Sequence, residues 1–172
     1  MKKLFMTIGI SGSGKSTYLK KRFKPETIIC PDSIRKELTG NIANHTMEPV
    51  IWATATKRVQ DALDKYGVAV LDATNVNASY RRGFLTPFKK VQDVERIALV
   101  FPTSAEMSKQ RVAADLKNKV DRSPVPDTAI DRQLKDFERG RAAIAMQFDR
   151  VEEVPVGEQR IQLKNLILEI MK

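Results

Sequence analysis

A glycine-rich stretch near the N-terminus places three glycines, three serines and a lysine where a strand must become a helix. Residues 9–16, Gly-Ile-Ser-Gly-Ser-Gly-Lys-Ser, match the pattern G-x-x-x-x-G-K-[ST] in full. Glycines let backbone N–H groups curl around phosphate oxygens, and the following helix turns its positive end to the same anion. Lys15 would reach the outer phosphates, and Ser16 would hold Mg²⁺. The sequence therefore predicts that the chain binds a nucleoside triphosphate, with ATP as the first choice. The residues expected to contact it are Gly9, Ser11, Gly12, Ser13, Gly14, Lys15, Ser16 and Thr17.

Two aspartates follow apolar runs further along the chain. Asp32 comes after residues 27–30, with Arg35 one helical turn beyond it, and Asp72 closes residues 68–72. Transfer of a phosphoryl group needs a carboxylate that orients the attacking hydroxyl or takes its proton. Asp32 suits that role, but it is also a good N-cap for a helix over residues 33–38. Asp72 is likewise able to act in the site or to shape the turn after its strand, together with Thr74 and Asn75.

The elements that must position these residues alternate between strand and helix patterns. Strands are predicted at residues 4–9, 27–30, 68–72, 96–101 and 151–154. Helices are predicted at residues 17–23, at 33–38 with Gly40 as the stop, and from 46–49 to the stop at Gly67. Further helices are predicted after Asn77, with an interruption near Pro87, after a Thr103/Glu106 capping box, after an N-cap at Asp127 to about 148, and at 162–171. This alternation predicts an α/β fold with a parallel sheet of four or five strands flanked by helices. Ligands of such sheets bind beyond the carboxyl ends of the strands, where Gly9, Asp32 and Asp72 fall.

Length and composition favour a single domain over residues 1–172 with a polyanionic partner. The chain has 172 residues, a formal net charge of +9 and an isoelectric point near 9.7. No run of 18 apolar residues is present, so no membrane span is expected. Cys30 is the only cysteine, which excludes an intrachain disulfide and favours a cytoplasmic protein. An oligomer is left open.

Four motifs in order resemble one family, the 5′-hydroxyl polynucleotide kinases of bacteriophage and bacterial end-repair systems. Besides the phosphate loop, they are PDSIRKELTGN at 31–41, VLDATNVNASYRR at 70–82 and DRSPVPDTAIDRQ at 121–133. The last string resembles the family's lid, expected here as a basic segment at about 113–127. The resemblance implies a P-loop kinase domain that transfers the γ-phosphate of an NTP to the 5′-OH end of DNA or RNA, single-stranded or frayed. It also implies the host cytoplasm if the protein is phage-encoded.

The resemblance assigns a role to each matching position. Asp32 would be the general base, and Arg35 would bind the acceptor's 3′-phosphate, helped by Asp72, Thr74 and Asn75. Arg122 would act on the transferring phosphoryl group as the lid arginine. The family often has an arginine doublet in the lid, whereas this chain offers Lys117, Lys119 and Arg122 at a different spacing. Which of these cations acts is left open.

Two other functions stay open. Small P-loop kinases for a nucleoside, sugar or antibiotic hydroxyl also place an aspartate after the second strand. A regulatory protein that binds an NTP without transferring its phosphate is the alternative from another class, although such a protein has no need of a base at Asp32. The strings DKYG at 64–67 and NKVD at 118–121 resemble GTPase motifs. Neither directly follows a predicted strand, so a GTPase is not favoured.

Overall fold

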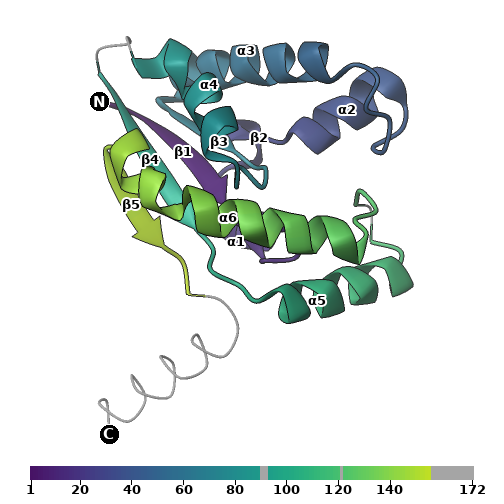
Figure 1. The fold of residues 1–172 in the computed structure, drawn as a ribbon. Helices are drawn as coiled ribbons and strands as arrows, with labels where there is room; N and C mark the ends of the chain where they lie inside the picture. Colours follow the sequence, from purple (N-terminus) through teal and green to yellow (C-terminus); the bar gives the residue numbers. More distant parts are fainter. Residues whose placement is uncertain (90–92, 121, 156–172) are drawn as a thin grey trace, which may run out of the picture.

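A computed structural model describes residues 1–89, 93–120 and 122–155. Within these residues one sheet of five parallel strands has the order β2-β3-β1-β4-β5 (Figure 1). In chain order the strands are β1 (Lys2–Ile8), β2 (Ile28–Ile29), β3 (Val68–Leu71), β4 (Val94–Val100) and β5 (Arg150–Glu153). The central strand β1 pairs with both neighbours, so that Leu4 lies between Ala69 and Arg96. The predicted parallel sheet is therefore confirmed.

Helices cover both faces of this sheet, but unequally. One face carries α1 (Lys15–Arg22), whose Leu19 packs with Phe5 of β1. The opposite face is built from Leu4, Met6 and Ile8 and is covered by three longer helices (Figure 1). These are α3 (Glu48–Tyr66), α4 (Ala78–Lys89) and α6 (Asp127–Gln147). Neighbouring side chains of a strand point to opposite faces, so every buried strand here is apolar on both sides.

The remaining helices lie at the ends of the strands. A short 3₁₀ helix, η1 (Pro25–Thr27), precedes β2, and α2 (Pro31–Thr39) follows it. Helix α5 (Ala105–Lys117) leads into the 118–126 loop and then into α6. In Figure 1, α5 and α6 lie side by side, and an ion pair of 2.7 Å joins Lys109 to Asp131 across them. The predicted segment at 113–127 therefore begins in α5 and ends at the first residue of α6, with the described residues 118–120 and 122–126 outside helices.

Several predicted helix ends are correct. The Asn77 side chain caps α4, because its Oδ1 accepts the N–H groups of Ser79 and Tyr80 at 2.9 and 3.1 Å. Helices α2 and α3 end at Gly40 and Gly67, whose φ angles of 73° and 71° are accessible to glycine. The predicted helix at 162–171 lies outside the described residues.

Three predicted boundaries are wrong. Helix α2 begins at Pro31, so Asp32 lies inside its first turn and is not the N-cap. Proline takes the first position because its fixed φ suits a helix and its missing N–H would be unpaired there. Helix α5 is capped by Ser104, whose Oγ accepts the N–H of Met107 at 3.2 Å, and not by Thr103. Similarly, Pro126 occupies the N-cap position of α6, and Asp127 is its first residue.

Helix α4 also continues through Pro87 to Lys89 instead of being interrupted. Proline removes one hydrogen bond, to the carbonyl of Gly83, but both residues lie on the exposed side of the helix, where water can replace it. Burial of Phe88 against the sheet holds the last turn in place. Among the described helices, none combines the length and apolar character that a bilayer crossing requires.

Candidate active site

The phosphate loop connects β1 to α1 and has the backbone shape that its glycines allow. Gly12 and Gly14 have φ angles of 78° and 89°, a region that residues with a Cβ rarely adopt. Gly9 is required for a different reason, because a Cβ there would lie 2.9 Å from the Cβ of Phe101. Helix α1 begins at Lys15, so its free N–H groups and positive end face the loop. The predicted contact residues Gly9, Ser11, Gly12, Ser13, Gly14, Lys15, Ser16 and Thr17 all lie on this loop and the first turn of α1.

Lys15 is buried inside the loop. Its Nζ donates to the carbonyls of Gly9 and Ile10 at 3.0 and 2.8 Å and to Ser13 Oγ at 3.3 Å. Loss of solvation lowers the pKa of Lys15 to about 8; the Asp72 charge opposes this shift and the Arg122 charge adds to it. An ammonium held only by neutral oxygens favours the approach of an anion, such as a nucleotide phosphate.

Ser16 and Asp72 come together at the carboxyl ends of β1 and β3. The Ser16 hydroxyl donates to Asp72 Oδ2 at 2.7 Å, and Asp72 is 8 % exposed. Burial raises the pKa of Asp72, although the Ser16 hydrogen bond and the Lys15 charge act in the opposite direction. Mg²⁺ prefers hard oxygen ligands and keeps several of its waters, so this hydroxyl and carboxylate fit the ion that the phosphate loop implies.

Asp32 projects from the first turn of α2 with its side chain half exposed. Its carboxylate accepts a short hydrogen bond from Nη1 of Arg35, one turn along the helix. The Asp32 charge acts on both Lys15 and Asp72, so the carboxylate lies within electrostatic range of the phosphate loop. Arg35 itself is only 4 % exposed. The structure therefore places Asp32 within electrostatic range of the phosphate loop, as a half-exposed carboxylate paired with a buried arginine; its role as a base stays a prediction.

Arg122 reaches the same region from the loop between α5 and α6. Its Nη1 donates to Asp115 at 2.5 Å, and its Nε is buried without a hydrogen-bond partner. The Arg122 charge contributes to the lowered pKa of Lys15. Lys117 and Lys119, the two other candidate lid cations, are exposed. Of these three cations, Arg122 is the one whose charge is among the main influences on the pKa of Lys15; its action on the transferring phosphoryl group stays a prediction.

Thr74 and Asn75 hold the loop after β3 against the phosphate loop. The Thr74 carbonyl accepts the N–H of Gly9 at 2.9 Å, and Asn75 Nδ2 donates to the Thr7 carbonyl at 2.8 Å. Asn75 has a φ of 46°, which asparagine tolerates better than most residues. These contacts fix the end of β3 and hence the position of Asp72; contact of either residue with a substrate stays a prediction.

Sequence reasoning missed three residues of this site. Gln133 Oε1 on α6 accepts the N–H of Ser11 at 2.8 Å, and Arg111 Nη1 on α5 donates to the Gly12 carbonyl at 3.2 Å. The third is Glu48 at the start of α3, which binds Arg35. Local sequence gives no signal for these contacts, because the partners of Ser11 and Gly12 lie about a hundred residues away.

Arg81, which belongs to the string VLDATNVNASYRR at 70–82, is a buried residue and not part of a solvated helix face. It is 1 % exposed and donates to the carbonyls of Asn75, Val76 and Gly140 and to Gln147 Oε1, all at 2.7–2.8 Å. Burial lowers the pKa of Arg81 to about 10. Arg81 therefore ties the loop after β3 to helix α6.

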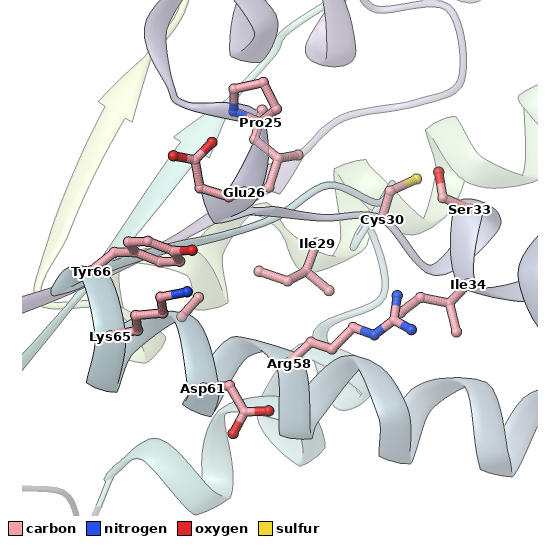
Figure 2. A pocket seen from close by; sticks show the side chains of 12 residues that line it. Pro25, Glu26, Ile29, Cys30, Ser33, Ile34, Arg58, Asp61, Lys65 and Tyr66 are labelled. Carbon is pink, nitrogen blue, oxygen red and sulfur yellow. The ribbon is translucent and has the colours of Figure 1, made fainter.

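A pocket of about 390 Å³ lies along the outer side of β2, on the sheet edge next to the Asp32 helix (Figure 2). Its lining includes Ile29 of β2, Arg58 and Tyr66 of α3, and Cys30 and Ser33. Burial raises the pKa of the Cys30 thiol, so the thiol is protonated at neutral pH and is a poor nucleophile. No phosphate-loop residue is among the described residues that line the pocket, which separates it from the nucleotide site.

A comparison with protein families agrees with this geometry. A family model described as an AAA domain matches residues 4–139. This chain belongs to that AAA-domain family. The match includes the phosphate loop, Asp32, Asp72 and Arg122 of the AAA-domain chain. No sequence among the curated proteins matches the chain.

Solved structures similar to the AAA-domain chain include kinases and an RNA repair complex. A chain of the Pnkp1/Rnl/Hen1 RNA repair complex aligns with a TM-score of 0.70 and 18% identity, over 83% of this chain and 46% of its own length. Shikimate kinase from Acinetobacter baumannii aligns with a TM-score of 0.54 and 17% identity, over 99% of this chain and 93% of the kinase. A gluconokinase from Sinorhizobium meliloti 1021 aligns with a TM-score of 0.53 and 18% identity, over 91% of this chain and 84% of the gluconokinase. The AAA-domain chain therefore has the P-loop kinase fold, and it spans less than half of the RNA repair chain.

Proposed function

We propose that residues 1–172 form one kinase domain that transfers the γ-phosphoryl group of an NTP, with ATP as the first choice, to the 5′-hydroxyl end of DNA or RNA. The observation that carries this proposal is the placement of Asp32. This half-exposed carboxylate is paired with the buried Arg35, and the Asp32 charge acts on both Lys15 and Asp72. The net charge of +9 favours a polyanionic acceptor. The likeness to a chain of an RNA repair complex supports the same choice.

Each group has a role in the transfer. The N–H groups of the loop and of the first turn of α1 bind the donor phosphates, and the Lys15 ammonium neutralises the outer ones. Ser16 and Asp72 would hold Mg²⁺, which when bound supplies further neutralisation of phosphate charge. Asp32 takes the proton of the acceptor hydroxyl as the hydroxyl oxygen bonds to the γ-phosphorus and the bond from that phosphorus to the departing nucleoside diphosphate breaks. Arg122, released from Asp115, would stabilise the transferring group as part of the lid at 113–127.

A labelled-phosphate assay tests the proposal. Purified protein is incubated with a γ-labelled NTP and a panel of acceptors: 5′-OH DNA, 5′-OH RNA, nucleosides, sugars and other small alcohols. We expect label on single-stranded 5′-OH ends, and loss of transfer in Lys15→Ala but not in Lys21→Ala, an exposed lysine on the same helix. Acceptor affinity should fall by roughly 0.7 log units per phosphate contact for each tenfold rise in salt. Transfer to small alcohols alone, with no salt dependence, would refute the choice of acceptor.

A second candidate, a kinase for a small-molecule hydroxyl, is favoured by one specific observation. Arg35, the residue that the family resemblance assigns to an acceptor phosphate, is already bound by two carboxylates, Asp32 and Glu48. An acceptor without a phosphate at that position, such as a sugar or a nucleoside, would leave this pairing undisturbed. The same panel of acceptors distinguishes the two candidates.

A further inference from the structure

Glu48 is the centre of a cluster of polar side chains next to the Asp32 base. Its carboxylate accepts hydrogen bonds from Arg35, with Nε to Oε1 at 2.7 Å and Nη2 to Oε2 at 3.2 Å. His45 Nδ1 lies 3.1 Å from Oε1, and Trp52 Nε1 donates to Oε2 at 3.1 Å. Partial burial acts to raise the pKa of Glu48, but the hydrogen bonds and charge of Arg35, helped by His45, outweigh it and hold that pKa below its usual range. Glu48 is therefore a firmly held anion.

Glu48 keeps its place without depending on Arg35 alone. It lies in the first turn of α3, where the helix dipole stabilises a negative charge. Trp52 is one turn further along the same helix, so its bond to Glu48 is maintained by the helix itself. Because of these two features, an incoming anion would displace Glu48 less easily than it would displace a flexible carboxylate on the surface.

Arg35 has little capacity left for another anion. Two of its nitrogens bind Glu48, while Nη1 donates to Asp32 and lies 3.5 Å from the Ile42 carbonyl. With 4 % of its surface exposed, the guanidinium lies beneath these partners. An acceptor phosphate could reach it only by displacing Glu48 or Asp32, and the buried guanidinium would then give up a charge-assisted hydrogen bond that it already has.

We propose that Glu48 is a positioning residue: through Arg35 it aims the Asp32 carboxylate at the acceptor hydroxyl, and it occupies the place on Arg35 that an acceptor phosphate would take. This inference rests on the proposed function and defines its acceptor more closely. The site recognises the reacting hydroxyl and its sugar, and it is indifferent to the charge of the first linkage beside them. Arg35 then acts through Asp32 and does not bind the acceptor's 3′-phosphate, the role that the family resemblance implies.

The test compares two 5′-OH oligonucleotides that differ only in the first linkage, a charged phosphodiester in one and a neutral methylphosphonate in the other. For the wild-type protein we expect kcat/KM values within about threefold of each other. In Glu48→Gln the Arg35 charge loses one of its two compensating carboxylates. We therefore expect at least a tenfold preference for the charged linkage, expressed in KM, together with a tenfold or larger fall in kcat at unchanged KM for the NTP. Glu48→Asp should restore part of kcat.

The matched control is Glu37→Gln, which removes another carboxylate paired with an arginine, Arg58 at 2.8 Å. It should leave both the linkage preference and kcat unchanged. Thermal melts show whether each variant is folded. If Glu48→Gln is not folded, kcat and the linkage preference of Glu48→Asp are compared with those of the wild-type protein instead.

Two results would overturn the inference. One is a wild-type preference of tenfold or more for the charged linkage that Arg35→Gln abolishes, because Arg35 would then bind the phosphate. The other is a folded Glu48→Gln protein with wild-type kcat. If the wild-type protein labels only a different hydroxyl, the proposed function fails, while the kcat comparison on that hydroxyl still tests Glu48.

Discussion

The lowered pKa of Lys15 makes nucleotide binding depend on pH in a predictable direction. The free protein holds this lysine with a pKa of about 8, chiefly because burial removes it from water. With that value, about nine-tenths of the Lys15 side chains carry a proton at pH 7 and about one-tenth at pH 9. A bound nucleotide places phosphate charges beside the ammonium and raises its pKa again, so binding selects the protonated lysine.

The size of the effect follows from this linkage. Nucleotide affinity should fall by about tenfold between pH 7 and pH 9, with a limiting slope of about one log unit per pH unit above pH 8. Binding should take up about 0.1 proton at pH 7 and about 0.9 at pH 9. Nucleotide phosphates lose their last proton near pH 6, so they are almost fully ionised above about pH 8, where the proton uptake reports Lys15 alone.

Isothermal titration calorimetry with ADP, in pairs of buffers with different ionisation enthalpies, measures both the affinity and the proton uptake. Arg122→Gln removes a charge that lowers the pKa of Lys15, so the transition should move to higher pH in that variant. The matched control is Arg139→Gln, which removes an exposed arginine of α6 and should leave the transition at the same pH. A constant affinity from pH 7 to 9 without proton uptake would refute the reasoning. An unshifted transition in Arg122→Gln would refute the placement of Arg122 near Lys15.

Three further predictions concern kcat and stability. Asp32→Asn should lower kcat by a factor of about 10² to 10⁴, which single-turnover assays measure. The free energy of unfolding should change by less than about 1 kcal/mol in melts, because Arg35 keeps its ion pair with Glu48. Arg81→Lys should cost about 2–4 kcal/mol in urea unfolding by leaving buried acceptors unpaired, whereas Arg82→Lys, at an exposed site, should stay within about 0.5 kcal/mol. Both Gly83 and Gly140 lie inside helices, but a Cβ at Gly140 would meet the Val76 carbonyl at 2.8 Å and nothing lies within 4 Å at Gly83. Gly140→Ala should therefore lose about 1–3 kcal/mol and Gly83→Ala gain about 0.5–1 kcal/mol, and equal effects in thermal melts would contradict this account.

Local sequence was sufficient for the features whose geometry is encoded within a few residues. Gly12 and Gly14 are at positions with positive φ, and the loop they shape begins where β1 ends. Apolar runs predicted β1 to β4, because a strand buried on both faces is apolar along most of its length, whereas β5 has the sequence RVEE and is largely exposed. Asp32 and Asp72 were placed near the phosphate loop by a general property of parallel sheets, whose carboxyl ends meet at one edge.

Only the tertiary structure decided which partners the site residues have. The bond between Ser16 and Asp72 joins residues 56 positions apart, and that between Ser11 and Gln133 joins residues 122 positions apart. Arg81 stands beside Arg82 in the sequence, yet packing buries the first and exposes the second, and nothing in the string itself distinguishes them. Likewise, Arg35 has the spacing of an anion-binding arginine, but Glu48 reaches it from the next helix. A side chain's type limits the bonds it can make, whereas the packing of distant segments determines which of those bonds form.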